Sequence, residues 1–154
     1  MIVFVGFLPS FQVDGVEWGC LVTKRHKPPL SVLAKCKYVL IDQGVVAAMQ
    51  REDAFAWYIK TLNTVRAVAP KAEVRVVVPD AYGDMDATRK LYWQFLKRMG
   101  RLLDGALKVL VLQKPQRVHI WVKTEEYRDA DVVAVPSKLM PLEGGSVACY
   151  RENP

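Results

Sequence analysis

Histidine and cysteine are scarce in this chain, which limits the metal and redox sites that it can build. The 154 residues include two histidines and three cysteines, and the cysteines are Cys20, Cys36 and Cys149. An odd number of scattered cysteines, with no pair at metal-ligand spacing, predicts neither a zinc site nor a disulfide framework. We interpret Cys36 and Cys149 as core residues and expect no metal and no cofactor. This usage favours an intracellular, reducing compartment, and hence a cytoplasmic protein.

Long apolar runs and phosphate-binding glycine loops are also missing. No apolar run approaches the roughly 18 residues that a membrane span needs, so we expect no membrane partner. The apolar residues 1–7 have no basic region before them, which favours a first buried strand over a secretory signal. Neither a Gly-x-Gly-x-x-Gly nor a Walker-type loop occurs. Asparagine is rare, at Asn63 and Asn153 alone, and Val, Lys and Arg are abundant. This composition leans toward a thermophilic source.

Length and charge point to one globular domain, residues 1–154. A chain of this size buries roughly 68–70% of its unfolded surface, which is enough for a good core. Hydrophobic residues make up 51% and charged residues 25%, as in ordinary globular proteins. The net charge is +6, which allows binding to nucleic acid but does not require it.

Strand and helix patterns alternate through the middle and end of the chain. This alternation implies right-handed βαβ units and an α/β fold with a parallel sheet, either partial TIM-barrel-like or an open three-layer sandwich. An apolar stripe at steps of three and four predicts a helix from Met85 to Leu103, with Asp84 as N-cap and Gly105 as its end. A second amphipathic helix runs through residues 55–65. The expected strands are residues 38–41, 73–78, 107–112 and 131–135.

Four shorter segments have weaker patterns. An Asp-Gly turn between apolar residues in Gln12–Glu17 predicts a hairpin. Residues 118–122 fit either a short strand or a loop packed on the core, and residues 124–127 fit one helical turn. The tail has a Gly144-Gly145 turn and room for one terminal strand.

Polar residues follow the expected strands at their carboxyl ends. They are Asp42, Asp80, Gln113, Ser137 and Lys138. In a parallel sheet these ends share one edge, where ligands bind. Carboxylates accept N–H bonds and an amide both donates and accepts, so the set suits a flat heterocycle. Burial that raised a carboxylate pKa would also suit acid–base chemistry, for which Asp80 is the candidate. The alternative is structural, because Asp often caps turns and helix starts.

A basic segment, residues 24–29, is the best candidate for contact with phosphate. Lys24, Arg25 and Lys27 would make that contact. The alternative is a solvated basic loop without a ligand.

The segment Val78–Thr88 resembles the Pro-Asp-x-x-Gly-Asp-x-x-Ala-Thr motif of tRNA-guanine transglycosylase-like proteins. The similarity is greatest to the branch that inserts 7-deazaguanine bases into DNA. Leu40–Gly44 lies where that superfamily has an Asp-Ser-Gly turn, and Val109–Gln113 where it has a strand ending in Gln. Asp131–Val135 resembles the strand before its base-binding loop. The resemblance covers residues 38–138.

The resemblance implies a TIM barrel that exchanges a guanine for a modified base through an Asp nucleophile. It also implies that Asp42 and Asp80 contact the base, that Gln113 hydrogen-bonds it, and that the partner is nucleic acid or a modified guanine. Here Gln43 replaces the Ser, and the strand with the nucleophile has no counterpart. A full barrel needs about 200 residues or more, so we expect a partial one, which a second copy of the chain could complete as a homo-oligomer.

Two other functions stay open on the sequence. One is a non-enzymatic basic α/β protein, of viral or mobile-element type, that binds nucleic acid or protein. Its binding would depend on salt and survive the loss of Asp80. The other is an unrelated small enzyme, such as a glycosyl-bond hydrolase, that uses Asp42 and Asp80 as a carboxylate pair.

Overall fold

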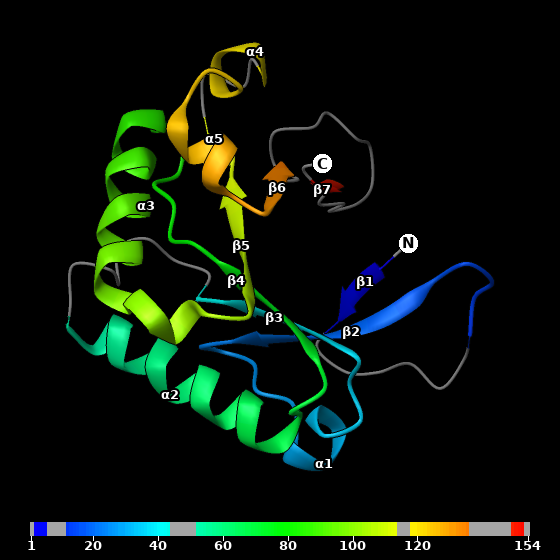
Figure 1. Ribbon diagram of the computed structural model, residues 1–154. Coiled ribbons are helices and arrows are strands. Elements are labelled where there is room, and N and C mark those ends of the chain that lie inside the picture. The colour runs from blue at the N-terminus through cyan, green and yellow to red at the C-terminus, as the bar shows by residue number, and fades with distance from the viewer. Residues whose placement is uncertain (1, 6–11, 44–51, 114–117, 136–148, 153–154) are drawn as a thin grey trace.

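The computed structural model describes residues 2–5, 12–43, 52–113, 118–135 and 149–152, which form one sheet with helices between its strands (Figure 1). The strands are β1 (Ile2–Val5), β2 (Glu17–Thr23), β3 (Tyr38–Asp42), β4 (Glu73–Val77), β5 (Ala106–Val111), β6 (Val132–Val135) and β7 (Cys149–Glu152). The helices are α1 (Leu30–Leu33), α2 (Glu52–Val68), α3 (Met85–Met99), the 3₁₀ helix η2 (Gly100–Leu103), α4 (Val118–Trp121) and α5 (Glu125–Asp129). No helix in the described part of the chain is long and apolar enough to cross a membrane.

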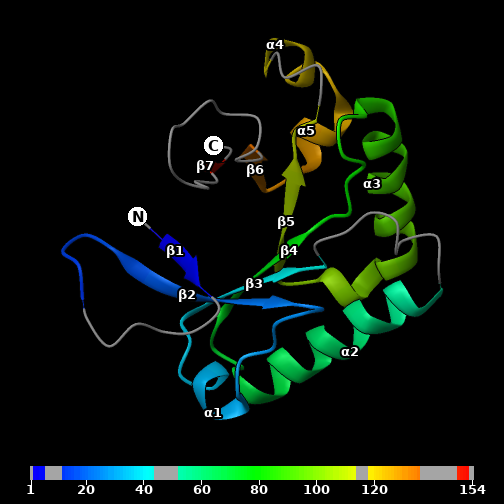
Figure 2. The same cartoon turned by 180° about the vertical axis from the view of Figure 1, so that it is seen from behind.

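The sheet is a curled half-barrel whose strands lie in sequence order. Strands β1 to β6 are parallel, and β7 pairs with β6 in the antiparallel sense. Because every right-handed crossover moves the chain in the same direction, the connecting helices fall on one face. Figures 1 and 2 show α1, α2 and α3 on that face. The predicted α/β parallel sheet is confirmed, in its partial-barrel form rather than as a three-layer sandwich.

Both faces of the central strands are apolar, as parallel strands require. Val39, Ile41 and Val76 pack against the helices in the larger core, together with Tyr58, Leu62, Phe95 and Met99 from α2 and α3. Leu40, Val77, Val109, Val132 and Ala134 form a smaller cluster on the opposite face. The strand ends are therefore fixed from both sides.

The expected hairpin at Gln12–Glu17 is wrong. Strand β2 runs parallel to β1, with Ile2 opposite Glu17. The Asp14-Gly15 turn is present, with a φ of +73° at Gly15, but it lies before the paired segment and does not join two antiparallel strands.

Two further boundaries differ from the expectation. Residues 118–121 are helix α4 rather than strand or loop, because β6 occupies the edge of β5 that this run would need. The long helix ends at Met99, where Gly100 has a φ of +50°. The chain then continues as the 3₁₀ helix η2, and the predicted helix end at Gly105 comes only after η2.

Cys20 of β2 and Cys36 after α1 form a disulfide, with their Cα atoms 6.2 Å apart. Both side chains are buried. Cys36 is a core residue as expected, but the expectation that the cysteines form no disulfide is wrong. The periodicity of the sequence could not reveal this disulfide. Whether Cys20 and Cys36 meet depends on how α1 returns the chain to the sheet.

This disulfide closes a loop of 16 residues, and a loop of that size contributes about 3 kcal/mol to the free energy of unfolding. We therefore expect a reductant to lower the urea midpoint of the wild-type protein. The double variant Cys20→Ala, Cys36→Ala serves as control, since its midpoint should not respond to the reductant. An equal response of both proteins would contradict the assignment.

Candidate functional site

The loop after β4 presents Asp80 and is fixed by the residues of the Pro-Asp-x-x-Gly-Asp-x-x-Ala-Thr motif. The Oδ1 atom of Asp84 accepts a hydrogen bond from the Ala87 N–H at 2.9 Å, which caps α3. The Ala81 N–H donates to the Thr88 hydroxyl oxygen at 2.9 Å, and that hydroxyl donates to the Asp84 carbonyl at 2.7 Å. Most of the motif therefore shapes this loop locally. The Asp80 carboxylate instead accepts a hydrogen bond from a residue outside the motif.

Gln113 connects the end of β5 to this loop. Its Nε2 atom donates to Asp80 Oδ2 at 2.6 Å, and its Oε1 atom accepts from the Gly83 N–H at 2.9 Å. Gly83 has a φ of +75°, which favours glycine. Trp121 of α4 donates from its ring to the Gln113 carbonyl at 2.9 Å. Gln113 is fully buried, so it positions Asp80 rather than facing an open surface.

Asp42, at the end of β3, lies close enough to Asp80 to change its ionisation. Burial first, and then the charge of Asp42, raise the pKa of Asp80 to about 6. Tyr58 of α2 lies between the same strand ends, and its hydroxyl donates to the Val77 carbonyl at 2.9 Å. Burial and the charges of Asp42 and Asp80 raise the pKa of Tyr58, while a backbone hydrogen bond from Gln43 lowers it. Asp80 therefore lies near Asp42 and is hydrogen-bonded by Gln113, at the ends of β3, β4 and β5.

Gln43 carries a buried amide without a partner. Its side chain is 6% exposed, and neither amide atom makes a hydrogen bond with the described residues. Buried amides are almost always paired. Gln43 directly follows Asp42 in the chain, so an unsatisfied donor and acceptor lie at the same edge of the sheet. We call Asp42, Gln43, Tyr58, Asp80 and Gln113 the strand-end site.

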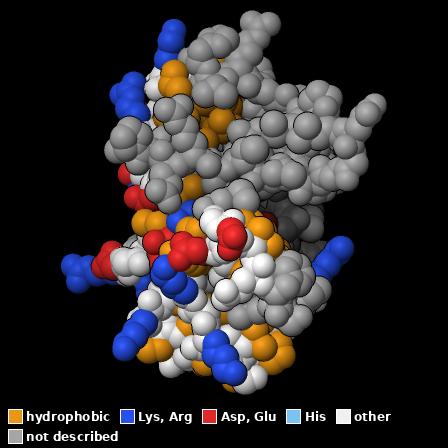
Figure 3. Space-filling view, turned by 90° about the vertical axis from the view of Figure 1, so that its right-hand side faces the viewer, with side chains coloured by type: hydrophobic (Ala, Val, Ile, Leu, Met, Phe, Trp, Pro, Cys, Tyr) orange, Lys and Arg blue, Asp and Glu red, His pale blue; other side chains and the backbone are white. Residues whose placement is uncertain are grey.

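The basic segment begins at the same edge of the sheet. Thr23, the last residue of β2, pairs in register with Asp42, and Lys24, Arg25 and Lys27 follow it with exposed side chains. A turn shapes the segment, since the Thr23 N–H donates to the His26 carbonyl at 2.7 Å. On the face shown in Figure 3, Lys and Arg side chains are scattered among acidic ones and form no single patch.

Other expected positions lie outside the described residues, namely Gly44, Lys114-Pro115, Pro136-Ser137-Lys138 and Gly144-Gly145. His119 falls within α4, but its side chain is not described. Within the described ranges, no group of three or more His, Cys, Asp or Glu side chains could hold a metal ion.

The sequence patterns missed three residues of this region. Tyr58 fits the apolar stripe of its helix, and nothing in that stripe indicates that its hydroxyl reaches the strand ends. Gln43 fits a turn, so its burial was not expected. Tyr82 is 67% exposed in the loop after Asp80, and an exposed aromatic ring inside a motif is the signal that could have identified it.

Comparison with protein-family models, curated proteins and solved structures gives no match. The chemistry of the site must therefore be argued from its own geometry. Two neighbouring carboxylates accept N–H bonds, and the Gln43 amide adds a donor and an acceptor. Asp80, with a pKa near 6, can take up or release a proton close to neutral pH.

The raised pKa of Asp80 makes stability depend on pH. The ordinary value is 3.8 and the folded value about 6, so the native state holds this proton more tightly than the unfolded state does. Stability falls as the pH rises through that interval, and the penalty is complete above it. We expect Asp80→Asn, which keeps an acceptor for Gln113, to raise the free energy of unfolding by about 3 kcal/mol near pH 7.5 and about 1 kcal/mol near pH 4.5.

Urea unfolding at both pH values measures this difference. The matched control is Asp86→Asn in the first turn of α3, which replaces an exposed acid outside the strand-end site. A constant difference between wild type and Asp80→Asn across this range would contradict the assignment.

Proposed function

We propose that the strand-end site binds a guanine-type nucleobase, on a scaffold related to tRNA-guanine transglycosylase-like proteins. The proposal depends mainly on one observation: Gln113 holds Asp80 in place beside a second carboxylate, Asp42. The ring N–H and the amino group of guanine are adjacent donors, and ionised carboxylates are acceptors only. The resemblance in the sequence supports the same choice of ligand.

The surroundings of the carboxylates also fit a base. The unpartnered Gln43 amide offers a donor for the carbonyl oxygen of guanine. The exposed ring of Tyr82, two residues after Asp80, offers a surface on which a base can stack. Lys24, Arg25 and Lys27 start beside Asp42 and supply positive charge for a phosphate. The partner would then be nucleic acid that contains the base.

The proposal is for binding, with base exchange as an additional step. Exchange through a covalent link requires a carboxylate that attacks the ribose. Asp80 is hydrogen-bonded by Gln113 and has a raised pKa, which makes it a better proton donor or acceptor than a nucleophile. In this chain Asp80 would give its proton to the departing base while the incoming base attacks the ribose carbon, and would take up the ring proton that the incoming base loses.

We expect guanine and 7-deazaguanine to bind and adenine not to bind, because adenine presents an acceptor where guanine presents a ring N–H. Isothermal titration calorimetry on the wild type measures this selectivity. Asp42→Asn and Asp80→Asn each remove one charged acceptor and should weaken guanine binding by about tenfold or more. Asp86→Asn on α3 is the control and should bind like the wild type.

Tyr82 gives an independent check. Tyr82→Phe keeps an aromatic ring and should preserve the affinity, whereas Tyr82→Ala should weaken guanine binding by about five- to tenfold. The proposal fails if no base binds, or if both Asp variants bind guanine as tightly as the wild type.

A further inference from the structure

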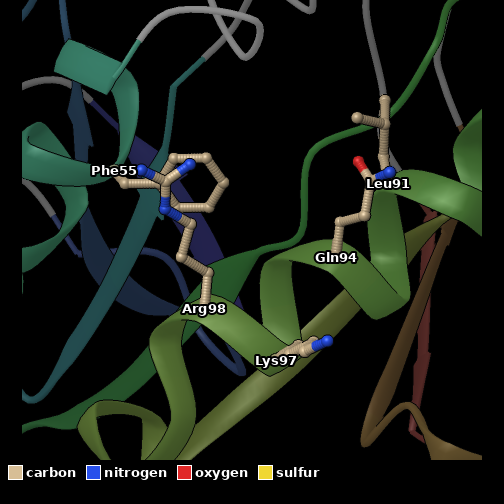
Figure 4. A pocket seen from close by; sticks show the side chains of 5 residues that line it. All are labelled: Phe55, Leu91, Gln94, Lys97 and Arg98. Atoms are coloured by element: carbon tan, nitrogen blue, oxygen red, sulfur yellow. The ribbon is translucent and has the colours of Figure 1, made fainter.

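A groove of about 450 Å³ lies between α2 and α3. Its lining residues are Phe55, Leu91, Gln94, Lys97 and Arg98, and we call it the α2–α3 groove. Figure 4 shows Phe55 and Arg98 together at one side and Gln94 with Leu91 at the other, while Lys97 extends away from Phe55. The volume lies within the range of small-molecule sites.

The Phe55–Arg98 pair forms a flat cationic surface. The Arg98 guanidinium lies 4.3 Å from the centre of the Phe55 ring. The ring is itself fixed, since Phe55 is buried and packs on Phe95 with centroids 6.2 Å apart. Arg98 is an exposed residue of α3. Nucleic-acid bases commonly stack on guanidinium planes held in this way.

The other side of the groove carries hydrogen-bonding and apolar groups. Leu91, Gln94 and Arg98 lie on one stripe of α3, at steps of three and four residues. The exposed Gln94 amide can donate to and accept from the edge of a base. Lys97 and Arg98 provide two positive charges, and none of the described lining residues is acidic. A planar ring system that carries a phosphate matches this arrangement.

We infer that the α2–α3 groove is a nucleotide-binding subsite, separate from the strand-end site. The base lies against Arg98 where that side chain covers Phe55, Gln94 contacts its edge, and Lys97 meets the phosphate. A free nucleotide and a nucleotide within a single-stranded nucleic acid carry the same base and phosphate, so both fit this subsite. The inference does not depend on guanine binding at the strand ends, because no residue is shared between the two sites.

The experiment measures binding of a fluorescein-labelled oligothymidylate by fluorescence anisotropy, with thymidine monophosphate as competitor. Thymine has no guanine-type edge, so the strand-end site does not contribute. The variant Lys97→Ala, Arg98→Ala should weaken binding by about tenfold and reduce the slope of log affinity against log salt by about 0.7, for the one phosphate contact of Lys97. The matched control Lys90→Ala, Arg101→Ala removes the same charge from exposed positions on α3 and η2 and should weaken binding by less than about threefold.

Arg98→Lys separates stacking from charge. It keeps the charge but loses the flat group, and we expect about fivefold weaker binding with an unchanged salt slope. Competition by thymidine monophosphate identifies the free nucleotide as a ligand, and binding of the oligonucleotide alone identifies a strand. The inference is overturned if the two double variants weaken binding equally, or if the wild type binds neither probe. Thermal unfolding of each variant confirms that it is folded.

Discussion

The hydrogen bond from Gln113 to Asp80 joins the ends of β4 and β5, and the geometry of the strand-end site depends on it. Gln113 has little freedom to move, because its amide oxygen accepts from Gly83 and its carbonyl accepts from Trp121. Each of these contacts brings another segment to the same point: the loop before α3 in one case and α4 in the other. Gln113 thus bonds to two other segments, the loop between β4 and α3 and helix α4, so its loss would cost more stability than the loss of any one of these hydrogen bonds.

The arrangement places charge where the protein alone does not stabilise it well. Asp80 is partly buried beside Asp42, and its pKa is raised for that reason. A surrounding of N–H donors would favour the ionised form and lower this penalty. Groups that lower the stability of the fold in this way are typical of functional sites, where they are retained because they bind a ligand. The unpartnered amide of Gln43 is a second penalty at the same place.

The sequence predicted the regular part of this fold well. Apolar runs and the stripe of α3 identify β3 to β6 and the two long helices, because burial on both faces of a sheet and on one face of a helix leaves a clear period. The meeting of Asp42 and Asp80 followed from the parallel sheet alone. What failed depended on contacts between distant segments: the parallel pairing of β1 with β2, the helix at Val118–Trp121, and the disulfide between Cys20 and Cys36.

One aromatic cluster supports both the strand-end site and the α2–α3 groove. Tyr58, whose hydroxyl lies at the strand ends, and Phe55, which lines the groove, are three residues apart on α2, about one helical turn. Both pack against Phe95 of α3, at 4.9 Å and 6.2 Å between ring centres. Phe95 is fully buried, so its truncation would cost about 3–5 kcal/mol and disturb both sites together. The two proposed binding activities can therefore be separated only through side chains outside this cluster, with Asp80 on one side and Arg98 on the other, while the shared aromatic support is left intact.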